Sequence, residues 1–169
     1  MLLDANVVIE LFKQQLWDKF IAKCNVYLAQ TVVDEAHFYE DSNGERQPID
    51  LAQYINSNAI TVFDPTLTEI AAFSAKFDLA YLDRLHDGEL ASLAYLLQQT
   101  EECRICSADK IVYRVIGNLR IKEQGISLQE ILQQIGLGRT LDQWFTQDYR
   151  EKWTSKGFEE SQYGIGAAS

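Results

Sequence analysis

Four acidic residues fall at points of the chain where folding could bring their carboxylates together: Asp4, Glu35, Glu89 and Asp109. Carboxylates that crowd within a few ångströms repel one another, and they stay ionised together only around a cation. Their hard oxygen atoms suit Mg²⁺ or Mn²⁺. Such ions activate bound water and neutralise charge on a phosphoryl group, so these residue types point to hydrolysis of a phosphodiester.

Each acid taken alone also has a simpler structural interpretation. Asp4 and Asp109 are good helix N-caps, and Asp87 is a good cap for the helix that contains Glu89. Glu89 in a first helical turn complements the helix dipole, and Glu35 fits a solvated helix face. Capping does not explain four acids at equivalent structural points. Spacing by itself nevertheless leaves the structural and the metal-binding interpretations equally weighted.

The elements that must position these acids alternate between β-like and helical runs, which is typical of a parallel sheet covered by helices. We expect strands over 1–3, 25–28, 59–63 and 104–107. We expect helices over 5–12, 31–39, 49–56, 66–77, 87–99, 109–116, 127–136 and 141–153. Thr31 is expected to cap the second of these helices, with Asp34 at capping-box spacing. Residues 41–48 form a loop by composition.

The acids stand where expected strands give way to helices. Asp4 and Asp109 each end an apolar strand, and the carboxyl ends of strands in an open parallel sheet form the ligand crevice. We therefore expect these two side chains to face one another across that crevice. Glu35, on the helix after the second strand, could reach the same place, and Glu89 lies in the first turn of its helix.

Four short segments carry the candidate acids in a characteristic order. They are LLDANVVI at 2–9, TVVDE at 31–35, HDGELA at 86–91 and CSADK at 106–110. The order of these segments resembles the four motifs of the PIN domain family of metal-dependent nucleases. The first is similar to an apolar strand that ends in Asp-x-Asn, the third to Gly-Glu opening a helix. The resemblance covers residues 1–136.

The resemblance implies a three-layer α/β/α sandwich with a central, mainly parallel sheet of about five strands. Residues 1–136 would form the catalytic domain, and 137–169 a C-terminal helical extension with a frayed tail, packed on the same domain. Carried over residue by residue, it makes Asp4, Glu35, Glu89 and Asp109 both catalytic and metal-binding, with Mg²⁺ or Mn²⁺ as the cofactor. Asn6 and Asp87 would support the site, and Asp34 could occupy the place of Glu35.

Two basic residues are the best candidates for phosphate contacts. Lys110 and Arg114 lie four residues apart on one helix face, with Arg120 and Lys122 nearby. A solvated helix surface is an equal alternative for them.

Other reactive or aromatic residues have structural interpretations that come first. Cys103 and Cys106 lack a second ligand pair for zinc, so they are expected to be half-buried or buried free thiols. His86 is more simply a loop histidine than a phosphate contact. The aromatic residues expected on the last helix favour core packing or a partner surface over base stacking: Trp144, Phe145, Tyr149 and Trp153.

Composition limits the class of protein. The 169 residues include 15 Lys and Arg against 25 Asp and Glu, a formal net charge of −10 without the basic surplus of a duplex-binding protein. A hydrophobic content of 47% excludes disorder, and three cysteines argue against a disulfide scaffold. The chain has neither an apolar run of about 18 residues nor a signal pattern, so we expect a cytoplasmic protein without a membrane contact.

Three functions compete at this stage. The first is a metal-dependent endoribonuclease that hydrolyses RNA; many bacterial PIN proteins are toxins held by a small antitoxin, so an antitoxin and a homodimer are candidate partners. The second is a PIN-like protein-interaction module with weak or lost catalysis, favoured by the net charge and by Ala5, Ala108 and Lys110 at positions where the family often has polar or acidic residues. A phosphatase of the haloacid dehalogenase type comes last, because Asn6 stands where it needs a second aspartate.

Overall fold

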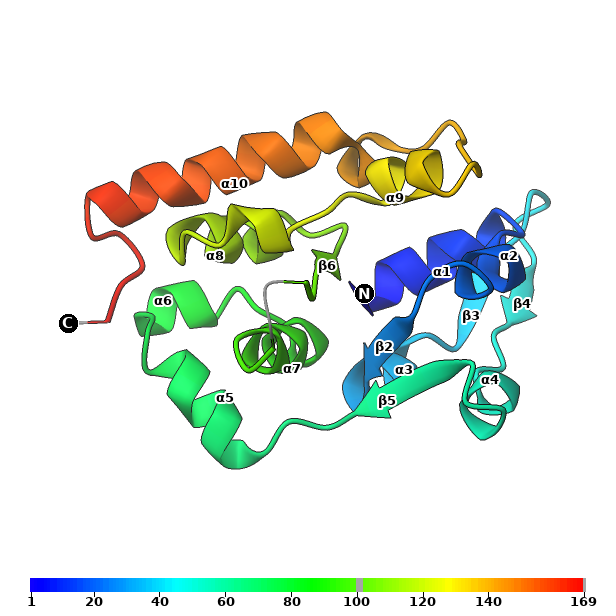
Figure 1. Cartoon of the computed structure of the whole chain (residues 1–169), viewed down its shortest axis with the longest axis horizontal. Coiled ribbons are helices and arrows are strands. Elements are labelled where there is room, and N and C mark those ends of the chain that lie inside the picture. Colours follow the sequence, from blue (N-terminus) through cyan, green and yellow to red (C-terminus); the bar gives the residue numbers. More distant parts are fainter. Residues whose placement is uncertain (100–101, 169) are drawn as a thin grey trace.

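A computed structural model describes residues 1–99 and 102–168, and four short apolar segments form its central sheet (Figure 1). The strands are β1 (Leu2–Leu3), β2 (Val26–Ala29), β5 (Ile60–Phe63) and β6 (Ile105–Cys106). They pair in the order β5-β2-β1-β6, and every pairing is parallel. The expected α/β class is therefore confirmed.

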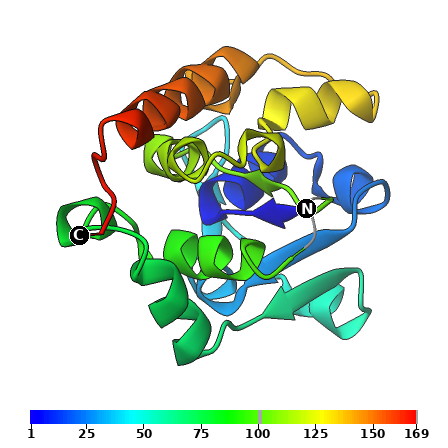
Figure 2. The same ribbon diagram turned by 60° about the vertical axis from the view of Figure 1, so that its left-hand side comes forward.

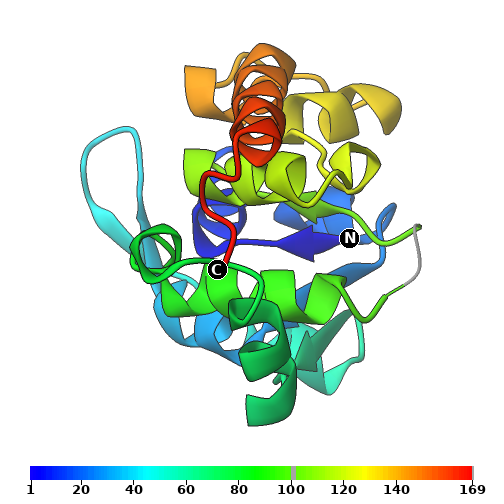
Figure 3. The ribbon, with the colours of Figure 1, turned by 90° about the vertical axis from the view of Figure 1, so that its left-hand side faces the viewer.

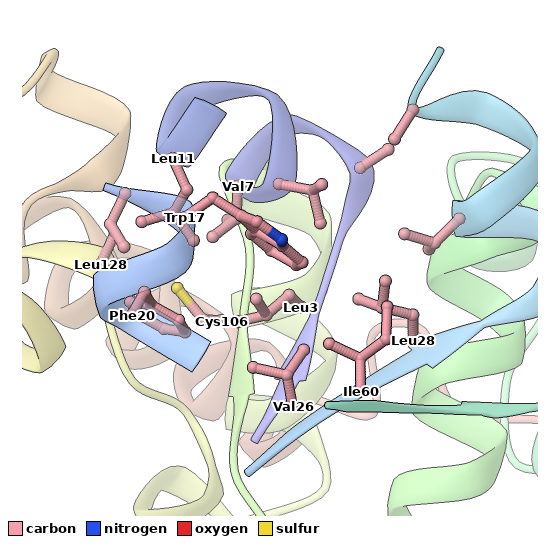
Figure 4. Close-up of a cluster of buried hydrophobic side chains, with 14 of the residues drawn as sticks. Leu3, Val7, Leu11, Trp17, Phe20, Val26, Leu28, Ile60, Cys106 and Leu128 are labelled. Atoms are coloured by element: carbon pink, nitrogen blue, oxygen red, sulfur yellow. The ribbon is translucent and has the colours of Figure 1, made fainter. Parts of the chain in front are cut away.

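Both faces of the sheet are buried, because neighbouring residues of a strand point to opposite sides. Leu3 and Cys106 belong to one core cluster, whereas Leu2 and Ile105 belong to the other. This double burial explains why the strands are apolar runs instead of alternating patterns. Figure 4 shows the first cluster, where Val7, Leu11, Trp17 and Leu128 close over the sheet.

Helices cover each face, which is consistent with a three-layer arrangement (Figure 1). The first face receives α1 (Ala5–Lys13), α2 (Trp17–Ile21) and α9 (Leu128–Gln134). The second receives α5 (Leu67–Ser74), α7 (Asp87–Leu96) and α8 (Lys110–Asn118). The short helix α4 (Ala52–Asn56) precedes β5, and α6 (Leu79–Leu82) lies between α5 and α7.

The strand order places one reversal of direction in the sheet. The chain moves outward from β1 to β2 and β5, then returns to the other side of β1 as β6. In open parallel sheets, ligands bind beyond the carboxyl ends of the strands at such a reversal. The ends of β1 and β6 are therefore the place to look for a site.

Local capping follows the sequence in most places. The Asp4 side chain accepts a hydrogen bond from Val7 N and caps α1, and Asp109 caps α8 in the same way through Ile111 N. Ser127 caps α9 as expected, in a capping box with Glu130.

The helix after β2 differs from the expectation. The helix α3 (Gln30–Glu35) begins directly after Ala29 without a side-chain cap, so the predicted capping by Thr31 is wrong. It ends at Glu35 because the next residues form a hairpin of β3 (Phe38–Glu40) and β4 (Arg46–Pro48). Asp41 closes this hairpin by accepting from the backbone N–H groups of Asn43 and Glu45, so 41–48 is only partly a loop.

Within the described residues the sheet has four strands, where about five were expected. At the β6 edge a single parallel bridge joins Ile105 to Gly125, and Ile126 N donates to the Ile105 carbonyl oxygen at 3.0 Å. The 3₁₀ turn η1 (Lys122–Gln124) precedes this bridge and the Ser127 cap follows it. Too few extended residues remain there for a fifth strand.

The C-terminal segment is also divided differently. The expected helix over 141–153 is replaced by a 3₁₀ turn, η2 (Gln143–Phe145), and by α10 (Gln147–Gln162), because the Thr146 hydroxyl accepts from Tyr149 N and starts α10 anew. The helix α10 lies along α8 (Figures 1 and 2). The two meet at Gly117 and Gly157, whose missing side chains let the backbones touch.

The tail after α10 is held in place and not frayed as expected. Asp78 N donates to the Gly166 carbonyl oxygen at 3.0 Å, and Ala168 N donates to that of Lys76 at 3.1 Å. These bonds tie the tail to the connection between α5 and α6, where the red segment ends in Figure 3. Ser169, the last residue of that expectation, lies outside the described residues.

Substitution of Gly157 tests the close helix contact. A Cβ at this position would overlap the Arg114 carbonyl group, a backbone atom that cannot move without separating α8 from α10. We expect Gly157→Ala to lower the free energy of unfolding by at least about 2 kcal/mol, as overpacking against rigid neighbours does. The measurement is urea unfolding followed by circular dichroism.

The matched control is Gly138→Ala, because a Cβ at that position meets no atom within 4 Å. We expect this change to stay within about 0.5 kcal/mol of the wild type. Equal unfolding midpoints for the two variants would contradict the tight α8–α10 crossing.

Candidate functional site

A buried carboxylate, that of Asp4, stands at the reversal between β1 and β6. Its side chain belongs to a residue that is only 4% exposed. One oxygen accepts from Val7 N at 3.0 Å, and the other accepts from Ala108 N at 3.1 Å and from the Ser107 hydroxyl. Burial raises the pKa of Asp4, while these hydrogen bonds act in the opposite direction. Three donors therefore fix the orientation of this carboxylate.

Ser107 is a residue of the site that the sequence analysis missed. It is fully buried, and its hydroxyl donates to Asp4 while accepting from Asp109 N at 2.9 Å. The Tyr113 hydroxyl accepts from Ser107 N at 3.2 Å and lies 2.8 Å from the Ser107 carbonyl oxygen. A small polar residue directly after a buried strand was the available signal. Ser107 thus connects the ends of β1 and β6.

Glu89 reaches the site from the first turn of α7. His86 is the N-cap of this helix, and its backbone N–H donates to Glu89 Oε2 at 3.0 Å. The predicted capping by Asp87 is wrong: a capping box joins the cap to the acid three residues later, which makes Asp87 the exposed first residue of the helix.

The charge on Glu89 is strongly disfavoured. Burial raises the pKa of Glu89 to about 8, against the lowering effect of the His86 N–H donor. The negative charges of Asp109, Asp4 and Glu35 raise it as well. The four acids predicted from the sequence therefore lie close enough to influence one another electrostatically.

Gly88 brings two of these acids near each other. A Cβ at Gly88 would lie 3.2 Å from Val32 Cγ2 and 3.7 Å from Glu35 Oε1. The absence of that atom lets the start of α7 approach the end of α3 closely. Glycine at this position is therefore explained by helix packing, which places Glu35 beside the first turn of α7.

Three of the four predicted acids line one small pocket of about 30 Å³, together with Asn6. This volume accommodates a water molecule or an ion. Asp4 and Glu89 are buried at its base, while Asn6 and Glu35 are exposed at its rim. Asp109 is not part of the lining; its carboxylate caps α8 beside the pocket.

The choice between Asp34 and Glu35 has a clear geometric answer. Asp34 is exposed and accepts a hydrogen bond from Gln30 Nε2 at 2.9 Å on the outer side of α3. Glu35 lines the pocket and makes no hydrogen bond within residues 1–99 and 102–168. Of the two acids, Glu35 is the one placed to act there.

The carboxylate oxygen atoms that line the pocket are of the kind that a hard divalent cation prefers as ligands. Glu89 Oε1 and the Glu35 carboxylate remain without hydrogen-bond donors among the described residues. The Asp4 carboxylate lines the same pocket and is oriented by its own donors. As the side chains stand, no three His, Cys, Asp or Glu of the described part converge at metal-holding geometry. Burial and the neighbouring negative charges raise the pKa of Glu89, and a cation would offset both effects.

The predicted phosphate contacts are placed unequally. Arg114 binds Glu160 through two bonds, Nη2 to Oε1 at 2.6 Å and Nε to Oε2 at 3.1 Å, and its guanidinium lies over the Tyr81 ring. Its charge is therefore already neutralised between α8 and α10, away from the pocket. Lys110 is exposed, with Nζ 5.7 Å from the centre of the Trp153 ring. Lys110 remains the candidate of the two.

A larger cavity of about 630 Å³ adjoins the pocket and shares Asn6 and Glu35 with it. We call it the aromatic groove, because rings from two distant segments line it: Phe38, Tyr39, Trp144 and Phe145. The sequence analysis missed this groove, since it placed Trp144 on a continuous last helix. Trp144 lies in the turn η2 instead, where its exposed ring lines the groove.

The cysteines agree with the structural interpretation made from the sequence. Cys106 is buried and Cys103 is half-buried, and neither forms a disulfide. Burial raises the pKa of both thiols, which makes them poor nucleophiles. They contribute to the two core clusters on opposite faces of the sheet.

Removal of the Ser107 hydroxyl tests its part in holding the site. In Ser107→Ala, the Asp4 carboxylate loses a donor and Asp109 N loses its acceptor. We expect the free energy of unfolding to fall by about 1–3 kcal/mol, the usual cost of leaving buried polar groups unpaired. Urea unfolding at neutral pH measures this.

Ser92→Ala is the control for removing a buried hydroxyl. Ser92 is 1% exposed, and its hydroxyl has no hydrogen-bond partner in the described part of the chain. We expect its loss not to lower the free energy of unfolding, because an unpaired buried hydroxyl contributes no hydrogen bond to the folded state. A Ser107→Ala protein as stable as Ser92→Ala would contradict the proposed link between the strand ends.

Glu89 makes stability depend on pH in a defined direction. Its pKa of about 8 in the folded chain exceeds the ordinary value of 4.5, so between these pH values the folded state keeps a proton that the unfolded state releases. Its contribution to the free energy of unfolding is therefore full below pH 4.5 and is lost as pH rises towards 8, by at most about 1.4 kcal/mol per pH unit.

The isosteric variant Glu89→Gln isolates this effect, because its amide oxygen can still accept from His86 N. We expect Glu89→Gln to gain stability relative to the wild type as pH rises from 5 to 8, measured by urea unfolding without divalent ions. Glu159→Gln, at a side chain that is 62% exposed, provides the control without a gain. A wild-type minus Glu89→Gln difference that is independent of pH would refute the assignment.

Comparisons with protein-family models and with curated proteins find no match to this chain. In the described residues, no helix has both the length and the apolar character needed to cross a bilayer. The chemistry of the pocket, its position in the sheet and the groove beside it are the observations from which a function can be derived.

Proposed function

We propose that this chain is a hydrolase that cleaves RNA phosphodiester bonds with the help of Mg²⁺ or Mn²⁺. The observation that carries the proposal is the pocket lined by Asp4, Glu35 and Glu89 at the reversal of the parallel sheet. A cluster of carboxylates costs folding free energy through mutual repulsion, and a bound cation would offset that cost. RNA as the substrate rests on the resemblance of the four acid-bearing segments to the PIN domain family.

Each residue has a distinct part in this proposal. Asp4, Glu35 and Glu89 would hold the cation, with Asp109 adjacent, and a cation there would activate water and neutralise charge on the reacting phosphate. Ser107 and the Ala108 N–H keep the Asp4 carboxylate in one orientation. Glu89, with a pKa of about 8, would release its proton when a cation binds.

Asn6 and Lys110 have supporting parts at the edge of the site. The Asn6 side chain lines the pocket and is exposed, so its amide is available to a substrate phosphate or hydroxyl. Lys110 is an exposed cation in the first turn of α8, directly after Asp109. The same resemblance makes a small inhibitory protein the first partner to seek, a homodimer the first assembly to test, and the cytoplasm the expected location.

A second function is favoured by charge. The net charge of −10 and the pairing of Arg114 with Glu160 leave little positive potential near the pocket. A protein-interaction module that keeps the fold and lacks turnover would need no such potential. Hydrolysis that is absent in the wild type despite correct folding would favour this alternative.

Glu35→Gln is the sharpest test of the hydrolase, because Glu35 makes no hydrogen bond within the described residues and its change should leave folding intact. We expect cleavage of labelled RNAs in Mg²⁺ or Mn²⁺ to fall by about a hundredfold through loss of one cation ligand. The measurement is the single-turnover cleavage rate of a mixed RNA set, with EDTA abolishing the wild-type reaction.

Asp34→Asn is the matched control, since Asp34 is the neighbouring acid and faces away from the pocket towards Gln30. Its cleavage rate should equal that of the wild type. Equal loss in both variants would point to a general charge effect, and cleavage unaffected by either Glu35→Gln or EDTA would refute the metal-dependent assignment.

A further inference from the structure

We propose that the aromatic groove binds unpaired bases of the RNA strand, with Phe38 and Trp144 as stacking platforms that position the strand for the acid pocket. This inference rests on the proposed function. In this arrangement the groove binds the bases of the substrate, and the pocket receives the phosphate that reacts.

Continuity between the two cavities is the first support. The groove and the acid pocket share Asn6 and Glu35, so a chain whose phosphate reaches the acids has the groove as its neighbouring volume. The groove, at about 630 Å³, is far larger than the pocket of about 30 Å³. The small pocket fits an ion and a reacting group, while the groove has room for bases.

The exposure of two large rings is the second support. Phe38 is 39% exposed and Trp144 is 40% exposed, whereas several other rings of the chain, such as those of Phe20 and Phe73, are almost completely buried. Exposed rings cost hydration free energy unless they have a partner. Base faces are the partners that aromatic side chains take in single-stranded RNA.

Both rings are held in position by a second group. The Arg46 guanidinium lies 4.2 Å from the centre of the Phe38 ring, on the neighbouring strand of the hairpin, which projects from the body of the molecule (cyan in Figure 3). The Trp144 ring lies edge-on to the Phe145 ring, with 6.4 Å between the ring centroids. Phe145 is only 3% exposed and is anchored in the core. Such preorganised rings lose little conformational entropy when a base stacks on them.

The charges of the groove disfavour phosphates as its occupants. Of the described residues that line it, Lys13 is the one cation, and its Nζ lies 4.0 Å from Glu10 Oε2. Glu40 stands opposite Arg46 in the hairpin register. Glu35, Glu40 and Asp142 are acids on the wall that form no ion pair among the described residues. A phosphate backbone would be repelled there, while neutral bases are not, and their amino groups can donate to carboxylates.

The expected ligand class is therefore single-stranded RNA whose bases face the protein. Bases inside a duplex are stacked on each other and cannot stack on Phe38 or Trp144. Among the described residues that line the groove, Lys13 is the one cation, so attraction to a duplex backbone would not replace the missing contacts between bases and rings. We expect duplex RNA of the same length to bind much more weakly.

The test measures binding separately from cleavage. A fluorescently labelled single-stranded RNA ten-mer is titrated against the Glu35→Gln protein in Mg²⁺, and affinity is read as fluorescence anisotropy. In that background we expect Phe38→Ala and Trp144→Ala each to weaken binding roughly fivefold to 150-fold, the range for loss of one stacking ring. Trp144→Phe should restore most of the affinity, because it keeps a ring at this position.

Phe158→Ala is the matched control, since Phe158 is 43% exposed and also lies under an arginine, with Arg120 5.7 Å from its ring. It lines a different cavity, between α8 and α10, and its loss should leave RNA binding unchanged. A ten-mer of the same charge with abasic sites should bind the Glu35→Gln protein with both rings intact only weakly. Its affinity should match that of the normal ten-mer for the Trp144→Ala variant in the same background.

The outcomes separate this inference from the proposed function. Equal binding of the abasic and the normal ten-mer, or unchanged affinity in both alanine variants, would overturn base stacking even if the wild type cleaves RNA. Base-dependent binding that needs Phe38 and Trp144, in a wild type that cleaves no RNA, would support the groove assignment and overturn the hydrolase. Capture of a protein segment in the groove, with no RNA binding, would overturn both.

Discussion

The burial of the Asp4 carboxylate is the constraint on which the rest of the site depends. A charged group that is 4% exposed needs hydrogen-bond donors, and the chain supplies them from α1 and from the segment after β6. Ser107 can donate only because β1 and β6 are neighbours in the sheet. One side chain therefore caps a helix, joins two strand ends and forms the base of the pocket. Loss of any one donor affects all three.

The acids around Asp4 destabilise the folded state through burial and mutual repulsion, and contacts of the neighbouring elements offset this loss of stability. Glu89 is held by the capping of α7, and Gly88 allows that helix to approach α3 despite the repulsion between their acids. On the far side of α8, the crossing with α10 and the Arg114–Glu160 pair keep α8 in place. The pair is partly buried and joins two helices, so its value is the removal of an unpaired charge more than net attraction.

Sequence reasoning succeeded at several local determinants, although the caps predicted at Thr31 and Asp87 were wrong. The N-caps Asp4, Asp109 and Ser127 follow from side chains that bond within three residues, and the strands follow from short apolar runs. It failed where a neighbour decides the conformation: the hairpin ended α3 early. The position of Ser107 after a buried strand was visible in the sequence, but its partner Asp4 was not, because that contact depends on β1 and β6 being neighbours. The groove likewise depends on which segments become adjacent, and no local pattern contains that information.

The distribution of charge connects the pocket with the groove. An acidic chain that acts on a polyanion must keep the phosphates away from its own carboxylates, except where a cation intervenes. The small pocket gathers Asp4, Glu35 and Glu89 into one place that a cation can neutralise. The groove offers rings in place of cations, so its attraction for a strand would come from base faces. Base stacking is an attraction that does not depend on basic side chains, so it would act on an RNA strand despite the net charge of −10.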